Sequence, residues 1–157
     1  MMTQYLECSL GGKDSSFTVE LLTSLAPESC HFLLNRLPIK AKTFNSKWNG
    51  AELFVVLPPM DILPNENPLD TPKVGDVVFF HRSSTYRAAP KTLRSENLGA
   101  YVELGFYYDS LIRAYGPDGR NSGTRLGRIV EGLKNLAETT STMRRKGFLP
   151  LSIKLRS

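Results

Sequence analysis

A strand followed directly by a helix is the feature of this sequence that most constrains its fold. Apolar residues stand at every second position of one segment, at Phe17, Val19 and Leu21, which is the period of a half-buried β-strand. Pro27 suits the first position of a helix, where the N–H that proline lacks has no partner within the helix. Apolar residues then recur at helical spacing, at Cys30, Leu33, Leu34 and Leu37. The pattern therefore predicts a strand over 17–22 and a helix over 27–37.

Short segments of strand character recur along the rest of the chain. We expect strands over 5–10, 77–81, 101–108, 125–130 and 149–155, and two extended pieces within 41–57. A second helix is expected from Glu131 to Gly147. Many short strands separated by turns are typical of a barrel or a sandwich, and two helices suit a barrel that is closed at its ends. The sequence therefore predicts a mainly β fold, a closed antiparallel barrel of about eight strands with two capping helices, as one domain over 1–157.

The composition is that of an ordinary globular domain. Of the 157 residues, 41% are hydrophobic and 22% are charged, so the chain can bury one core. Its two cysteines, Cys8 and Cys30, have no metal-binding or redox spacing, and we expect both to be reduced. We find no signal-peptide pattern at the N-terminus and no apolar run of membrane-spanning length. A cytoplasmic protein without a membrane partner is therefore expected.

The net charge of +5 favours anionic partners in general. The basic residues are dispersed along the chain, and only Arg144, Arg145 and Lys146 are contiguous. No nucleic-acid-binding module or alternation of aromatic and basic residues accompanies them, so we expect no nucleic-acid partner. Basic residues outnumber acidic ones between 82 and 125. Loops there could be merely solvated, or they could hold a carboxylate or a phosphate.

Residues 58–74 form a long segment without a periodic pattern that contains five prolines. A loop of this length in a compact domain is usually either functional or disordered. Prolines lower the conformational entropy that is lost on ordering, and Met60, Ile62, Leu63 and Leu69 offer apolar side chains to bury. We expect an ordered flap that folds over the barrel edge beside Trp48, and a mobile surface loop is the alternative.

Two strand–helix segments carry a resemblance to a known family. The first is Val19-Glu20-Leu21 followed by Ala26-Pro27, and the second is GRIVEGLKNL over 127–136. Both are similar to segments of cyclophilins, in the same order, and the resemblance implies a cyclophilin-like barrel. True cyclophilins carry Phe-His-Arg and then Gln-Gly-Gly soon after the first helix, where this chain has TFNSKWNGAELF. The tripeptide Phe80-His81-Arg82 stands too late in the chain to replace that motif.

These departures resemble a second group, small bacterial proteins with a cyclophilin-like barrel and no assigned activity. The similar features are Trp48 and Glu52 in the third strand region, Glu66-Asn67-Pro68, and Gly75-Asp76 before an aromatic strand. The resemblance implies the barrel and hardly constrains the chemistry. Because the arginine and glutamine of the isomerase groove are missing, we expect no efficient peptidyl-prolyl isomerase activity. That activity remains the second alternative.

Seven residues are candidates for a small-molecule site between the third strand and the long loops. Glu52 and His81 are the candidate acid–base residues, and the candidate ligand-binding residues are Trp48, Arg82, Glu103, Tyr107 and Arg125. Such a set could orient an anionic, partly apolar metabolite without a cofactor. No cluster of His and Cys predicts a metal site. Each candidate also has a structural interpretation, and a protein-interaction or homo-oligomer-forming module is the competing class of function.

Overall fold

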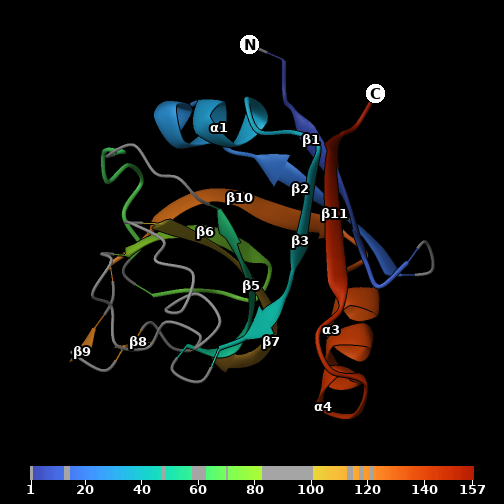
Figure 1. Cartoon of the computed structure of the whole chain (residues 1–157). Coiled ribbons are helices and arrows are strands. Elements are labelled where there is room, and N and C mark those ends of the chain that lie inside the picture. Colours follow the sequence, from blue (N-terminus) through green and yellow to red (C-terminus); the bar gives the residue numbers. More distant parts are fainter. Residues whose placement is uncertain are drawn as a thin grey trace.

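Nine strands of the described chain form one antiparallel sheet that curls into a nearly closed barrel (Figure 1). The computed structural model describes residues 2–12, 15–46, 49–57, 63–69, 71–82, 101–112, 115–116, 119–120 and 122–157. The strands of the sheet are β1 (Tyr5–Leu10), β2 (Ser16–Leu21), β3 (Ile39–Lys42), β4 (Phe44–Asn45), β5 (Gly50–Leu57), β6 (Asp76–Arg82), β7 (Tyr101–Ile112), β10 (Thr124–Glu131) and β11 (Pro150–Leu155). They pair in the order β3-β11-β1-β2-β10-β6-β7-β5-β4. Strand β3 also lies beside β5, which brings the two edges of the sheet together.

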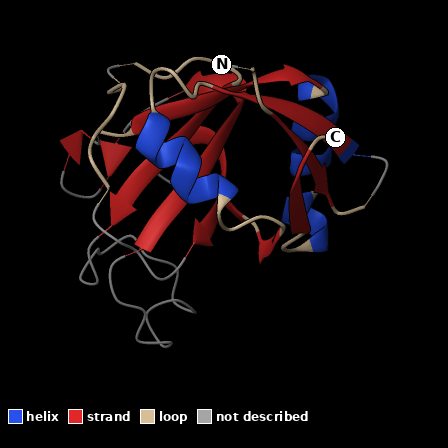
Figure 2. Cartoon of the chain, turned by 90° about the horizontal axis from the view of Figure 1, so that it is seen from above, coloured by secondary structure: helices blue, strands red, loops and turns tan. Residues whose placement is uncertain are grey.

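Helices lie at the two ends of the barrel. Helix α1 (Pro27–Leu34) crosses one end (Figure 2), and α3 (Leu133–Ser141) and α4 (Met143–Lys146) lie toward the other (Figure 1). A separate two-stranded ribbon pairs β8 (Tyr115–Gly116) with β9 (Gly119–Arg120). The N- and C-terminal strands β1 and β11 are neighbours. The predicted mainly β barrel with helices at its ends is therefore confirmed, whereas a specific likeness to cyclophilins remains a prediction. No helix in the described part of the chain is long and apolar enough to cross a membrane.

The interior of the barrel holds the main apolar core. Alternate residues of each strand point inward, for example Val77 and Phe79 on β6 and Leu104 on β7. The helices close this core, and Phe32 of α1 meets Phe79 edge to face, with 5.8 Å between the ring centroids. Free thiols at Cys8 and Cys30 are buried in the same core. Burial of this apolar surface is the main term that stabilises the fold, at about 25 cal/mol per Å².

Three element boundaries differ from the sequence-based expectation. Helix α1 ends at Leu34 rather than at residue 37, because the N–H groups of Arg36 and Leu37 bond to carbonyls three residues back, as in a tightened last turn. Strand β7 continues to Ile112 rather than ending at residue 108, since its pairing with β5 extends to Gly50. The second helix breaks after Ser141, where the Thr142 hydroxyl donates to the carbonyl of Thr139 and weakens the helical pattern.

A second, smaller apolar cluster lies on the opposite side of the central strands. We call the face of β5, β7, β6 and β10 that turns away from the barrel core the outer face. Its buried apolar residues are Val78, Phe80, Tyr107 and Leu69, with Ile112 packed against them. Strands β5, β7 and β6 are therefore covered on both faces, which agrees with the apolar character of both faces of the 50–57 segment.

Residues 63–69, part of the proline-rich segment, are tied to β10 and to α1. The carboxylate of Glu66 accepts hydrogen bonds from the backbone N–H groups of Glu28 and Ser29, at 3.1 and 2.9 Å, and from the Ser29 hydroxyl at 2.9 Å. The Asn67 side chain donates to the carbonyl of Arg125, and Leu69 N–H donates to Gly123. This part of the predicted flap is thus ordered against the barrel. Residues 58–62 and 70, and the predicted contact with Trp48, lie outside the described residues.

We predict that Glu66 stabilises the protein as a cap of α1. Replacing it (Glu66→Ala) removes an anionic acceptor from the positive end of the helix dipole and should cost about 1–2 kcal/mol of unfolding free energy. Urea denaturation measures this cost. The matched control is Glu28→Ala, because Glu28 lies at the same helix end and its side chain is exposed. Equal losses for the two variants would contradict the capping role.

Candidate functional site

Strand register brings five of the seven candidate residues to the outer face. Glu52 on β5 lies opposite Tyr107 on β7, and Phe80 on β6 lies opposite Glu103. Arg82 follows two positions after Phe80 on the same strand face, and Arg125 on β10 pairs with Val78. Acidic, basic and phenolic side chains therefore alternate with apolar ones on this face of the barrel wall.

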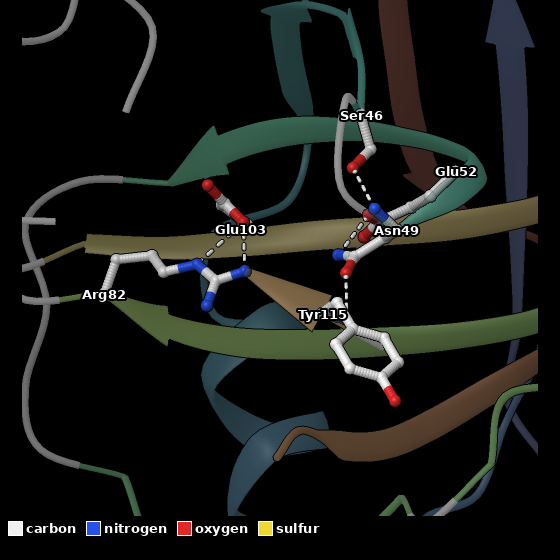
Figure 3. Close-up of polar contacts among 6 residues, drawn as sticks. All are labelled: Ser46, Asn49, Glu52, Arg82, Glu103 and Tyr115. Carbon is white, nitrogen blue, oxygen red and sulfur yellow. Dashed lines mark hydrogen bonds and ion pairs between the residues drawn. The ribbon is translucent and has the colours of Figure 1, made fainter. Parts of the chain in front are cut away.

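Glu52 is the most constrained of these residues. Its side chain is 0% exposed, and its Oε2 accepts a hydrogen bond of 2.6 Å from Nδ2 of Asn49. The Oδ1 atom of Asn49 accepts from the backbone N–H of Tyr115 at 3.0 Å, which fixes the orientation of the amide. Figure 3 shows Asn49 between Glu52 and Tyr115, with the Ser46 hydroxyl accepting from the Asn49 backbone N–H. The other carboxyl oxygen, Oε1, is buried and has no hydrogen-bond partner among the described residues.

Gly105 provides the space for this carboxyl group. A Cβ atom at position 105 would lie 2.0 Å from Oε1 of Glu52, which is far inside van der Waals contact. Gly105 stands between Glu103 and Tyr107 on the same face of β7, so it leaves a gap in the row of side chains. The Glu52 carboxyl group fills that gap, so a larger residue at position 105 would displace the carboxyl group.

Burial controls the protonation of Glu52. Its pKa is raised from 4.5 to about 8, mainly because burial removes hydration from the charged form and, to a smaller extent, because the Glu103 carboxylate lies nearby. Hydrogen bonds from Asn49 and Ser46 and the charge of Arg82 offset only part of this rise in pKa. The neutral acid therefore predominates at neutral pH. Since Oε2 already accepts from Asn49, we assign the proton to Oε1.

Glu103 and Arg82 form a buried ion pair beside this group (Figure 3). The Nε and Nη2 atoms of Arg82 both lie 2.8 Å from Oε2 of Glu103, and both side chains are at most 6% exposed. Burial raises the pKa of Glu103, and the adjacent guanidinium offsets part of that rise. The guanidinium also lies 5.0 Å from the centroid of the Phe80 ring. The Arg82 side chain is thus fixed by its ion pair with Glu103 and its contact with the Phe80 ring.

A second ion pair lies across the outer face at Arg125. Its Nη2 atom lies 2.9 Å from Oδ2 of Asp76 and donates to the carbonyl of Thr71 at 3.3 Å. The Nε atom of Arg125 is buried and has no hydrogen-bond partner within the described part of the chain. Tyr107 lies between the two ion pairs, and burial raises the pKa of its phenol, so the phenol stays neutral.

His81 does not join this group. His81 pairs with Val102, whose side chain belongs to the barrel core, so alternation directs His81 to the opposite face of β6 from Arg82. Burial and the charge of Arg82 lower the pKa of His81, which favours its neutral form. Trp48 lies outside the described residues. The expected convergence of His81 with Glu52 is therefore not found, whereas the place of Trp48 stays a prediction.

Sequence reasoning missed three residues that shape the site: Asn49, Asp76 and Gly105. Two of them left a signal in the sequence. Asn49 precedes Glu52 by three residues across a turn, and Gly105 interrupts a strand between two polar residues of the same face, a position that often marks close approach of another group. Asp76 looked like a turn residue because it follows Gly75. Across the described residues, no three His, Cys, Asp or Glu side chains gather as a metal site would require.

Comparison with protein families gives one match, over residues 8–154, to a family described as a protein of unknown function (DUF3830). The chain belongs to the DUF3830 family. This match spans nearly the whole barrel, so the DUF3830 fold is the barrel described above. A comparison with curated proteins found no match.

The solved structures that resemble this DUF3830 chain include two with a TM-score above 0.5. The structure of McbB in complex with tryptophan is 13% identical, with a TM-score of 0.65 over 95% of this chain and 44% of McbB. The chain thus spans less than half the length of McbB. The solution structure of the hypothetical protein AF2241 from Archaeoglobus fulgidus is 18% identical, with a TM-score of 0.55 over 97% of this chain and 94% of AF2241. At these identities the likeness concerns the fold alone.

We predict that Glu52 makes the stability of the protein fall as the pH rises. Its folded pKa of about 8 exceeds the ordinary value of 4.5, so between these values the unfolded chain releases a proton that the folded protein keeps. The slope for one proton is about 1.4 kcal/mol per pH unit, and it vanishes below the lower and above the upper pKa.

Urea denaturation of the wild type and of Glu52→Gln at several pH values tests this prediction. The variant keeps a neutral side chain of the same shape, so its stability relative to the wild type should increase from pH 4.5 to about 8. Titration of the Glu52 carboxyl carbon by NMR gives the pKa directly. If the unfolding free energies of the wild type and of Glu52→Gln changed in parallel with pH, or if the NMR pKa lay near 4.5, the assignment of a neutral carboxyl group would be refuted.

Proposed function

We propose that the DUF3830 chain binds a small, partly apolar anionic metabolite on its outer face, with Glu52 as the acid–base group. The observation that carries the proposal is the fully buried Glu52 carboxyl group, whose Oε1 has no hydrogen-bond partner among the described residues. An unpaired buried carboxyl group costs stability and is uncommon in folded proteins. Strongly perturbed acids of this kind are concentrated at functional sites.

The unpaired polar atoms of the outer face favour a ligand that accepts hydrogen bonds. In its neutral form Glu52 presents an O–H donor at Oε1, and Arg125 presents an N–H donor at Nε. The strongest acceptors on the same face, the carboxylates of Glu103 and Asp76, are already paired with arginines. A carboxylate or another anionic oxygen would therefore satisfy these two donors better than a cation would.

The surroundings of the two donors favour an apolar ligand body. Register places Gly105, Val78 and Arg125 on three successive strands, so Gly105 and Arg125 are separated by two strand spacings, about 10 Å. Val78 lies between them and belongs to one buried apolar cluster with Leu69 and Tyr107. The McbB structure contains tryptophan, an amino acid with a carboxylate and an aromatic body, and this makes indole carboxylates reasonable first probes.

The acid–base role follows from the protonation state of Glu52. An acid with a pKa of about 8 can donate a proton at neutral pH and accept it back without a large energetic penalty. On binding an anion, the neutral carboxyl group donates a hydrogen bond instead of repelling the ligand, as an ionised carboxylate would.

We predict that indole-3-propionate binds to the outer face and that tryptamine does not bind there. The two probes share the indole ring and differ in the sign of their charge. Amide shifts in NMR titrations should map to β5, β7 and β10, and Glu52→Ala and Arg125→Gln should each weaken binding about tenfold. Arg128→Gln is the matched control, because Arg128 lies on the same strand in an exposed ion pair with Glu20. Equal amide shifts from both probes, or an equal loss of affinity in Arg128→Gln, would refute the proposal.

We also expect no proline isomerase activity. The Arg82 guanidinium is buried in its ion pair with Glu103, so it cannot approach a prolyl amide in a peptide without breaking that pair. A proline-peptide assay should give the uncatalysed rate. Strong catalysis that is lost in Arg82→Lys would reinstate the isomerase alternative.

A further inference from the structure

A hollow of about 580 Å³ lies at the α3 end of the barrel, apart from the donors of the outer face. It is bordered by the end of β7, the turn between β4 and β5, and one side of α3. Its lining residues are Asn45, Ser46, Gly50, Ala51, Tyr108, Asp109, Ser110, Leu111, Ala137, Thr140 and Ser141. The volume falls within the range of about 300–1,000 Å³ that is typical of small-ligand sites.

One part of the lining is apolar and built from small or exposed side chains. Ala51 and Ala137 leave space on the β5 and α3 sides. Leu111 on β7 is 61% exposed although it borders the hollow, so much of its apolar surface is not covered by the described chain. An alkyl group in the hollow would remove this surface from water, which is favourable by about 25 cal/mol per Å².

Two hydroxyl groups of α3 in the lining offer only hydrogen-bond acceptors. The Thr140 hydroxyl donates to the Leu136 carbonyl at 2.7 Å, and the Ser141 hydroxyl donates to the Glu138 carbonyl at 2.6 Å. Each of these hydroxyl groups has then used its hydrogen and keeps only lone pairs for a ligand. A ligand that fits this part of the hollow must therefore bring donors of its own.

Asp109 supplies the charge. Among the described residues of the lining it is the charged one, and one of its carboxylate oxygens accepts from the backbone N–H of Ser110 at 2.7 Å. No described cation forms an ion pair with Asp109, although the protein carries a net charge of +5. A carboxylate without a described cationic partner, beside hydroxyl groups that can only accept, favours a cationic ligand.

We infer that this hollow binds a small aliphatic primary amine in its ammonium form. The ammonium group has three N–H donors and no acceptor, which matches the Asp109 carboxylate and the hydroxyl lone pairs of Thr140 and Ser141. The alkyl group packs against Leu111 and Ala137. This site is independent of the proposed anion site, since its charge preference is opposite and its lining does not include Glu52 or Arg125.

The test uses three probes with one carbon skeleton: n-butylammonium, n-butanol and n-butyrate. Titrations followed by amide NMR shifts should place n-butylammonium at residues 108–111 and 137–141, with weaker binding of the alcohol and none of the carboxylate. Asp109→Asn should weaken n-butylammonium binding about tenfold, as loss of a charged hydrogen bond does. Glu7→Gln is the matched control, because it removes one partly exposed carboxylate from β1, outside the hollow.

Two further variants separate the outcomes. Ala137→Leu fills the hollow without changing charge and keeps a good helix former in α3, so it should abolish the shifts. Glu52→Gln should leave n-butylammonium binding unchanged, which distinguishes this site from the anion site. Binding of n-butanol as tight as that of n-butylammonium, or unchanged binding in Asp109→Asn, would overturn the inference.

Discussion

The burial of β5, β7 and β6 on both faces is the constraint on which the rest of the structure depends. One face of these strands packs into the barrel core, and the outer face carries its own apolar cluster around Val78, Phe80 and Tyr107. Polar side chains on the outer face therefore lie in a region from which water is largely excluded. Each of them must be paired, neutralised or left unsatisfied at a cost.

The outer face uses all three solutions. Arg82 with Glu103 and Arg125 with Asp76 are paired ions. Glu52 is neutralised by protonation, and its Oε1 is left without a partner among the described residues. Such an unsatisfied group costs about 1–3 kcal/mol, a large fraction of the net stability of a domain. The Asn49 bridge and the gap at Gly105 hold the carboxyl group in place despite that cost.

The same physical logic separates the two proposed sites. The outer face presents donors between apolar side chains, whereas the hollow beside α3 presents acceptors and one carboxylate. Ser46 stands between them, since it lines the hollow and its hydroxyl accepts from the backbone N–H of Asn49. A ligand in the hollow would therefore lie beside Ser46, a residue of the hydrogen-bond network that holds Glu52.

Alternation and turn chemistry in the sequence determined the class of fold. Periods of two residues at 17–21 and 101–107 predicted strands, and Pro27 predicted a helix start, because these signals depend only on local geometry. They also placed Glu103 and Tyr107 on the face away from the core. Boundaries such as the end of β7 were not predictable locally, because pairing with β5 rather than propensity extends that strand.

Tertiary structure alone decided the candidate site. The sequence grouped His81 with Glu52, but strand pairing directs His81 to the opposite side of the sheet. It also gave no reason to expect Asp76 beside Arg125, because the two residues lie on neighbouring strands that are far apart in the chain. The protonation of Glu52 depends on burial by distant segments, a long-range property that no local pattern encodes. The sequence therefore predicted which residue types lie on which strand face. Hydrogen-bond partners, charge states and cavities depend on how the fold brings distant strands together, so they could not be predicted from local patterns.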